Sequence, residues 1–291
     1  MTARVFILTL LAMIAFASNS ILCRAALRDT AIDAASFTFI RIFSGAVALW
    51  LIVTIRRSTS SKAGNWISAF ALFAYAAAFS FAYKTLSAGT GALLLFGAVQ
   101  ATMIFWGLYR GERLRALQIV GLVLAITGLI VLVSPGITAP PLVGSILMLS
   151  AGIAWGVYSL RGKGTSNAIA ATTGNFVRTV PFAALVSVIA IGQMHLDSLG
   201  VTYAAISGAI TSGLGYVIWY SVLPQIKASS AAVVQLSAPV LVATGGILLL
   251  GEPITLRYVI ASIAVLGGIF LVVIEKRRGP SGTGSISSVR Q

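Results

Sequence analysis

The chain has 291 residues, of which 58% are hydrophobic and only 9% are charged, and its mean hydropathy is +0.99. Soluble domains are about a quarter charged, so this composition excludes an ordinary soluble protein and indicates a membrane protein. Twenty basic residues against six acidic ones give a net charge of +14. In a soluble protein this excess would suggest nucleic-acid binding. Here the basic residues lie between apolar runs, so we expect them to set membrane topology and expect no nucleic-acid partner.

Ten apolar segments are long enough to cross a bilayer, because about 20 residues at 1.5 Å each span about 30 Å of hydrocarbon. They are 5–24, 34–55, 65–84, 88–109, 116–134, 142–161, 168–192, 199–222, 228–250 and 257–275. The first segment contains the small-residue run AFAS at 15–18, which is also typical of a signal-peptide cleavage site, but the ten-helix layout needs this segment as a helix. We therefore predict an all-α integral membrane protein with ten transmembrane helices.

The basic residues divide unevenly between the two sides of the predicted membrane. With a cytoplasmic N-terminus, fourteen lie on the inner side and four on the outer side, and Arg41 and Arg178 lie within helices. This excess predicts that both termini are cytoplasmic. The tail 279–291 is rich in Gly and Ser, and we expect it to be disordered.

Several short matches recur along the chain at nearly constant spacing. GERLRALQIVG around Glu112 resembles GEPITLRYVIA around Glu252, and these two glutamates lie 140 residues apart. FIR at 39–41 resembles FVR at 176–178, at a spacing of 137. Several matches in the same order indicate an internal repeat, whereas one alone would be weak evidence.

The repeat divides the chain into two five-helix halves, 1–135 and 142–275. Five is an odd number, so the second half must cross the membrane in the opposite sense, and the repeat is inverted. Secondary transporters use inverted repeats to form two related conformations around a site near the bilayer midplane.

This layout resembles the EamA-type drug/metabolite transporters, which share the 5+5 inverted repeat, an arginine in the second helix of each half and a Gly-Glu motif before its last helix. Within that family, the length and the aromatic residues most resemble the bacterial aromatic amino acid exporters of the YddG type. The resemblance implies that helices 1, 3, 4, 6, 8 and 9 surround a cavity and that helices 5 and 10 support it from outside.

Arg41 and Arg178 are the charges placed well inside predicted helices. A charge at this depth costs at least about 2.5–3.5 kcal/mol, so each requires a reason. Either arginine could bind a substrate carboxylate, bond to backbone carbonyls or reach the membrane surface with its long side chain. Their matching positions in the two halves favour a shared structural role.

Glu112 and Glu252 each precede the last helix of their half, where helix dipole and free amide groups favour an anion. We predict that they fix loops and helix ends, paired with Arg113 or Arg115 and with Arg257. The other acidic residues and His195 also map to loops or helix ends. Without a buried titratable group near the midplane, facilitated diffusion or exchange is favoured, and proton coupling through a group at a helix end stays open.

Polar and aromatic residues inside the cavity helices are the candidates for substrate contact. They are Asn19, Tyr75, Phe79, Tyr83, Gln100, Trp155, Tyr158, Tyr216, Trp219 and Gln235. Those near helix ends could instead be interface aromatics, and the amides could instead join helices. No catalytic residue, cofactor or metal ligand is predicted.

These patterns and the resemblance favour a secondary transporter of a bacterial inner membrane that exports aromatic or other neutral amino acids and related metabolites. An enzyme would need a catalytic cluster at membrane depth, and a channel more often uses charged rings or carbonyl filters. A proton-coupled drug, metabolite or nucleotide-sugar transporter of the same fold is the alternative. The expected partners are a small solute and the bilayer, and the chain is compatible with a monomer.

Overall fold

The computed structural model describes residues 2–56, 63–111, 113–162, 165, 167–226, 231 and 234–278, with side chains up to 274. Glu112 and the predicted disordered tail lie outside these ranges. The helices are α1 (Ala3–Asp29), α2 (Ala34–Ile55), α3 (Trp66–Tyr83), α4 (Ala88–Tyr109), α5 (Ala116–Val133), α6 (Leu142–Gly162), α7 (Ala168–Ile189), α8 (Ser198–Ile206), the π-helix η2 (Ser207–Leu214), α9 (Gly215–Val222), α11 (Ser237–Leu250) and α12 (Leu256–Arg278).

Within the described ranges all regular secondary structure is helical, as predicted. Nine helical stretches there are long and apolar enough to cross a membrane, and α8, η2 and α9 belong to a single stretch that runs to Gln225. The shorter apolar helix α11 lies in the segment predicted at 228–250. The first helix is longer than predicted and continues past residue 24 to Asp29, because no glycine or proline interrupts it there.

Short polar side chains start many of these helices by accepting hydrogen bonds from free amide groups of the first turn. The capping residues are Asp33 for α2, Asn65 for α3, Ser87 for α4, Asn167 for α7 and Asp197 for α8. Each of these residues directly precedes its helix, so the side-chain cap determines where the helix begins.

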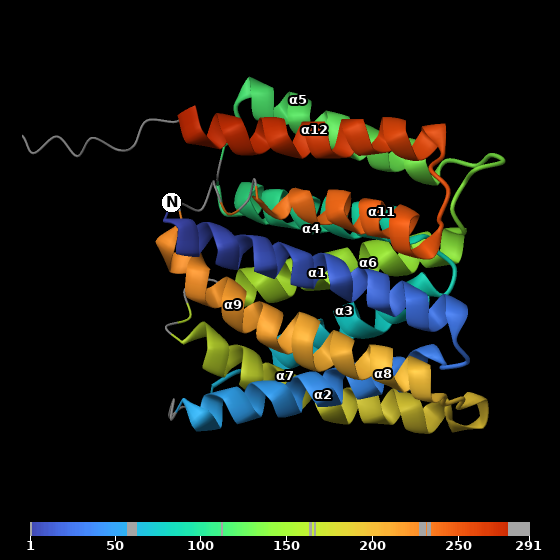
Figure 1. Ribbon diagram of the computed structural model, residues 1–291. Coiled ribbons are helices and arrows are strands. Elements are labelled where there is room, and N and C mark those ends of the chain that lie inside the picture. The colour runs from blue at the N-terminus through green and yellow to red at the C-terminus, as the bar shows by residue number, and fades with distance from the viewer. Residues whose placement is uncertain are drawn as a thin grey trace, which may run out of the picture.

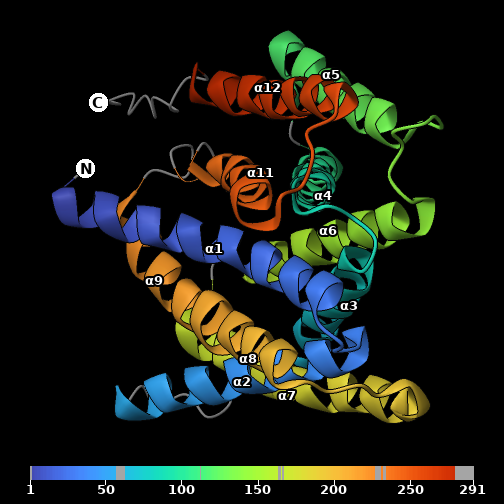
Figure 2. The same cartoon turned by 45° about the vertical axis from the view of Figure 1, so that its right-hand side comes forward.

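The helices lie side by side in a bundle, and Figures 1 and 2 show α5 and α12 as a pair at one edge, with α2, α7 and α8 at the opposite edge. Between these edges, α6 packs against α3 and α4, while α1 packs against α11, α9 and η2. The N-terminal end of α1 and the C-terminal end of α12 lie on the same side of the bundle (Figure 1).

Glycines hold the α5–α12 pair together. A methyl group on Gly121 would overlap the carbonyl oxygen of Gly268, and one on Gly268 would overlap that of Gly121. Close backbone approach of this kind is how small residues drive helix association in membranes. The pair packs mainly on itself, and the chemistry of the interior therefore lies in the other helices.

Candidate functional site

Aromatic side chains from both predicted halves meet in the middle of the bundle. The ring of Trp155 on α6 lies 4.8 Å from that of Tyr75 on α3 and 5.5 Å from that of Tyr216 on α9, measured between centroids. Ring contacts extend this group to Phe79, Tyr83, Tyr158, Phe16 and Trp219. We call these residues the aromatic cluster.

Asn19 on α1 links this cluster to the π-helix. Its amide Nδ2 donates to the Tyr75 hydroxyl at 3.5 Å, and its Oδ1 accepts from the Ser207 hydroxyl at 2.7 Å and from Thr211 at 3.4 Å. All four residues are buried. Local π-helical turns occur frequently at functional sites, and here the turn presents two hydroxyl groups to one amide.

Gly208 lets the π-helix approach α2 closely. A methyl group at this position would overlap the carbonyl oxygen of Arg41 and the hydroxyl of Ser44. The backbone of η2 therefore lies directly against the turn of α2 that carries Arg41.

Arg41 lies beside the aromatic cluster and is only 2% exposed. Its guanidinium carbon is 4.8 Å from the centroid of Phe79 and 5.4 Å from that of Tyr75, both within cation–π range. Its Nη2 donates to the Tyr75 hydroxyl at 3.2 Å, while Nε and Nη1 have no hydrogen-bond partner among the described residues. A buried cation with free donors is costly, so this arrangement requires an explanation.

Arg178, the matching arginine of the second predicted half, is held differently. Its Nη1 donates to the backbone carbonyls of Ala63 and Gly174, each at 2.9 Å. These bonds tie the segment before α3 to α7. Arg178 therefore has the backbone partners that a structural role requires, whereas no backbone carbonyl accepts from Arg41 among the described contacts.

Glu252 joins three helix ends on the opposite side of the bundle from Arg178. One carboxylate oxygen accepts from Arg24 Nε of α1 at 2.9 Å, and the other accepts from the amide of Ala88 at the start of α4 at 2.7 Å. The predicted partner, Arg257, instead donates to the carbonyl of Ser134. The expected pairing was wrong because the long α1 brings Arg24 within reach.

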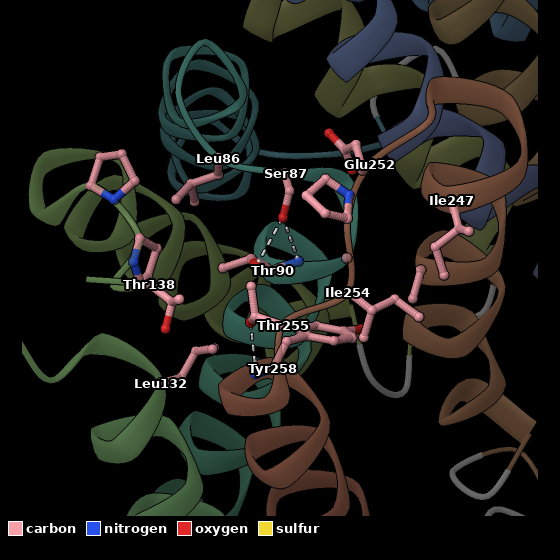
Figure 3. A pocket seen from close by; sticks show the side chains of 15 residues that line it. Leu86, Ser87, Thr90, Leu132, Thr138, Ile247, Glu252, Ile254, Thr255 and Tyr258 are labelled. Atoms are coloured by element: carbon pink, nitrogen blue, oxygen red, sulfur yellow. Dashed lines mark hydrogen bonds between the residues drawn. The ribbon is translucent and has the colours of Figure 1, made fainter. Parts of the chain in front are cut away.

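A cavity of about 210 Å³ lies near Glu252. Figure 3 shows Ser87 and Thr90, at the start of α4, close to Thr255 and Tyr258, at the start of α12. Except for Glu252, none of the predicted site residues lines this cavity. We place the candidate site at the aromatic cluster, because the buried charge and the converging polar groups are found there.

Eight of the ten residues predicted for substrate contact are therefore joined by ring contacts or hydrogen bonds. The remaining two are elsewhere. Gln100 faces a small crevice lined by α5 and α12, and Gln235 lies just before α11. Trp219 belongs to the group only through the ring of Phe16.

Sequence reasoning missed Phe16, Phe176, Ser207 and Thr211. Phe176 lies 6.1 Å from Tyr216, measured between ring centroids. Phe176 is the first residue of the FVR pattern, and this match to FIR was a signal by which it could have been found. The two hydroxyl residues had only the nearby glycines of SGAITSGL as a hint.

At the end of the bundle where α2 begins, Asp33 accepts hydrogen bonds from the amides of Ala35, Ser36 and His195 at 2.9, 2.9 and 3.1 Å. Burial acts to raise the pKa of Asp33, but these hydrogen bonds outweigh it and hold that pKa below its usual range. Within the described ranges, no three acidic, His or Cys side chains gather as a metal site would require.

The model of the EamA-like transporter family matches this chain over residues 3–134 and again over 142–274. An uncharacterized protein of Pseudomonas aeruginosa is 55% identical over 271 residues, covering 93% of this chain and 94% of that protein. The uncharacterized transporter YoaV of Bacillus subtilis is 24% identical over 249 residues, covering 81% and 85%.

A solved structure titled "Crystal structure of protein" covers 96% of this chain and all of its own, with a TM-score of 0.65 and 16% identity, which shows a shared fold. The family and the relatives' names indicate transport of small molecules by a multi-pass membrane protein, and they do not indicate an enzyme. The chain belongs to the EamA-like transporter family.

Proposed function

We propose that the protein is a secondary transporter that exports aromatic or other neutral amino acids from a bacterial cell by alternating access. The observation that carries this proposal is the position of Trp155 between Tyr75 of the first half and Tyr216 of the second. A flat apolar solute bound among these rings would contact both halves at once. Movement of one half against the other would then change its surroundings.

The inverted repeat is part of this proposal, and the helix contacts support it. If the halves are exchanged, α6 takes the place of α1, the stretch of α8, η2 and α9 takes that of α3, and α11 takes that of α4. The contact of α3 with α6 then corresponds to that of α8, η2 and α9 with α1, and the contact of α4 with α6 corresponds to that of α11 with α1. Glycine packing follows the same exchange: Gly128 faces the carbonyl of Ala261, and Gly268 faces that of Gly121. Exchanged contacts of this kind are expected for two halves related by a two-fold axis in the membrane plane.

Alternating access also needs contacts that can open at either end. At one end Glu252 joins α1 to the start of α4. At the other end Arg161 of α6 donates to Ser68 at 3.1 Å and to Asn65 at 3.2 Å, at the start of α3. By the distribution of basic residues, we assign the Glu252 end to the outside. We propose that the two sets of contacts open alternately.

The placement of acidic residues supports a facilitator or exchanger. Among the described side chains, the carboxylates are Asp29, Asp33, Asp197 and Glu252, and all four lie at or near helix ends. None contacts the aromatic cluster through a hydrogen bond or ion pair of the described residues. A proton-coupled carrier usually places a titratable group on the transport path.

Counterflow of radiolabelled phenylalanine, tyrosine and tryptophan in liposomes containing the purified protein tests this function. We expect saturable uptake that is little changed by an imposed pH gradient. Trp155→Ala should remove most of it, while Trp50→Ala should not, because Trp50 is 55% exposed on the outer face of α2. Absence of saturable flux for any aromatic or neutral amino acid contradicts the substrate assignment, and flux driven strongly by protons contradicts the facilitator mechanism.

A further inference from the structure

We infer that Arg41 is the binding site for the carboxylate group of the transported solute, and that a solute without an ammonium group also binds there. This inference rests on the proposed transport function for its biological meaning. Its basis is the set of contacts around the guanidinium group.

The guanidinium group of Arg41 has hydrogen-bond donors without a partner among the described residues. The guanidinium group carries five N–H donors, and Nε and Nη1 together hold three of them. Among the described residues only the Tyr75 hydroxyl accepts from this group, through Nη2. Arginine binds a carboxylate through two parallel N–H donors, and enough donors are free here for such a pair.

The positive charge of Arg41 is not paired with any described carboxylate. The described carboxylates are engaged elsewhere: Glu252 with Arg24, Asp29 with Arg28, and Asp33 and Asp197 with amide groups. The rings of Phe79 and Tyr75 stabilise the cation but do not neutralise it. Burying an unpaired charge costs several kcal/mol, and an anionic ligand would offset that cost.

The groups beside Arg41 indicate what the rest of the solute should be. The Oδ1 atom of Asn19 already accepts from Ser207 and Thr211, and no described carboxylate is available for an ammonium group. The neighbouring surface is aromatic, provided by Phe79, Tyr75 and Trp155. These groups fit an organic monocarboxylate with a flat apolar body. An amino acid meets this description, but its ammonium group finds no dedicated partner.

The test uses two compounds of nearly identical shape, 3-phenylpropionate and its neutral amide, with purified protein in detergent. Thermal unfolding is measured for wild type, Arg41→Gln and Arg178→Gln. We expect 3-phenylpropionate to raise the melting temperature of wild type and Arg178→Gln but not of Arg41→Gln. The amide should bind wild type at least about tenfold more weakly, a difference of about 1.4 kcal/mol.

Three results would overturn the inference: equal effects of acid and amide on wild type, an undiminished response of Arg41→Gln to the acid, or equal stabilisation by sodium chloride. The last would assign Arg41 to inorganic anions. The acid–amide comparison on wild type decides the matter even where Arg41→Gln does not fold. Carboxylate binding without amino acid flux would reject the proposed transport function alone, while amino acid flux that is unchanged in Arg41→Gln would reject this inference alone.

Discussion

Arg41 and Arg178 end the same three-residue pattern in α2 and α7, yet their surroundings differ. Arg178 donates to two backbone carbonyls, whereas Arg41 faces aromatic rings with Nε and Nη1 unpaired among the described residues. Gly174 explains part of the difference, because it brings the carbonyl of Ala63 close to α7 and into the reach of Arg178. The same sequence pattern thus occurs in two surroundings, and the neighbouring backbone decides which arginine keeps unpaired donors among the described residues.

The largest expected effect comes from removing each charge in turn. Arg41→Gln should reduce phenylalanine counterflow at least about 30-fold, because losing one partner of a buried charged pair costs about 2 kcal/mol or more. Arg178→Gln should leave the affinity near the wild-type value. Initial rates of phenylalanine counterflow are measured for both variants in liposomes with matched protein amounts. Equal losses in the two variants would remove the distinction between the arginines.

The second effect concerns the end of the bundle opposite Arg178. Glu252→Gln removes the charge that holds Arg24 and weakens the bond to the amide of Ala88. We expect a maleimide reagent to label Cys23, which is buried and is the only cysteine of the chain, about tenfold faster. Asp29→Asn is the matched control, because Asp29 pairs with Arg28 rather than with Glu252 among the described contacts, and this partly exposed pair should contribute little. Unchanged labelling in Glu252→Gln would show that this contact does not close the site.

A third test moves the surroundings of Arg41 without changing any polar group. Gly208→Ala should push η2 away from α2, because the added methyl group would overlap the carbonyl of Arg41. Overpacking of this kind costs about 1–3 kcal/mol. Gly213→Ala, in the same π-helix, would meet ordinary contacts, the nearest of them at 3.4 Å from Ala48. Melting temperature and phenylalanine affinity should both fall in the first variant and hold in the second. The reverse order would contradict the close packing described here.

The fourth test compares the arginines in the protein without ligand. Arg178→Gln should lower the free energy of unfolding by about 1–3 kcal/mol, because two partly buried carbonyls lose a charged donor. Arg41→Leu should leave the stability unchanged or raise it, because an unpaired buried charge is removed. Thermal unfolding in one detergent measures both. A large loss of stability in Arg41→Leu would indicate that Arg41 is structural after all.

The smallest effect concerns the start of the helix that carries Arg41. Because the pKa of Asp33 is lowered in the folded protein, its contribution is complete above the usual aspartate range and is lost as the pH falls through the lowered value. Asp33→Ala should cost about 1 kcal/mol at neutral pH, as the loss of a good helix cap does. It should also weaken the acid dependence of the melting temperature. If the melting temperature of the variant fell at acidic pH as steeply as that of the wild type, this assignment would be contradicted.

Much of the fold follows from the length of the apolar runs, which predicted the helical segments. The extra turns of α1 could not be predicted, because Arg24 looks like a membrane boundary until its contact with Glu252 is known. Polarity indicated that Gln100 faces protein but not which helices it faces. Residue type placed Tyr75, Trp155 and Tyr216 in the interior, and only the fold shows that their rings meet.

The two arginines could not be distinguished from their sequence pattern, because the difference lies in carbonyl groups supplied by a distant segment. The π-helical turn of η2 likewise has no clear signal beyond its glycines. The inverted relation of the two halves remains a proposal that the exchanged contacts support.

Titration calorimetry of 3-phenylpropionate into wild type, Arg41→Gln and Arg178→Gln tests the central claim most directly. The account predicts that wild type and Arg178→Gln bind with similar affinity and that Arg41→Gln binds at least about 30-fold more weakly. Equal affinity in all three proteins, or an equal loss in both variants, would contradict it.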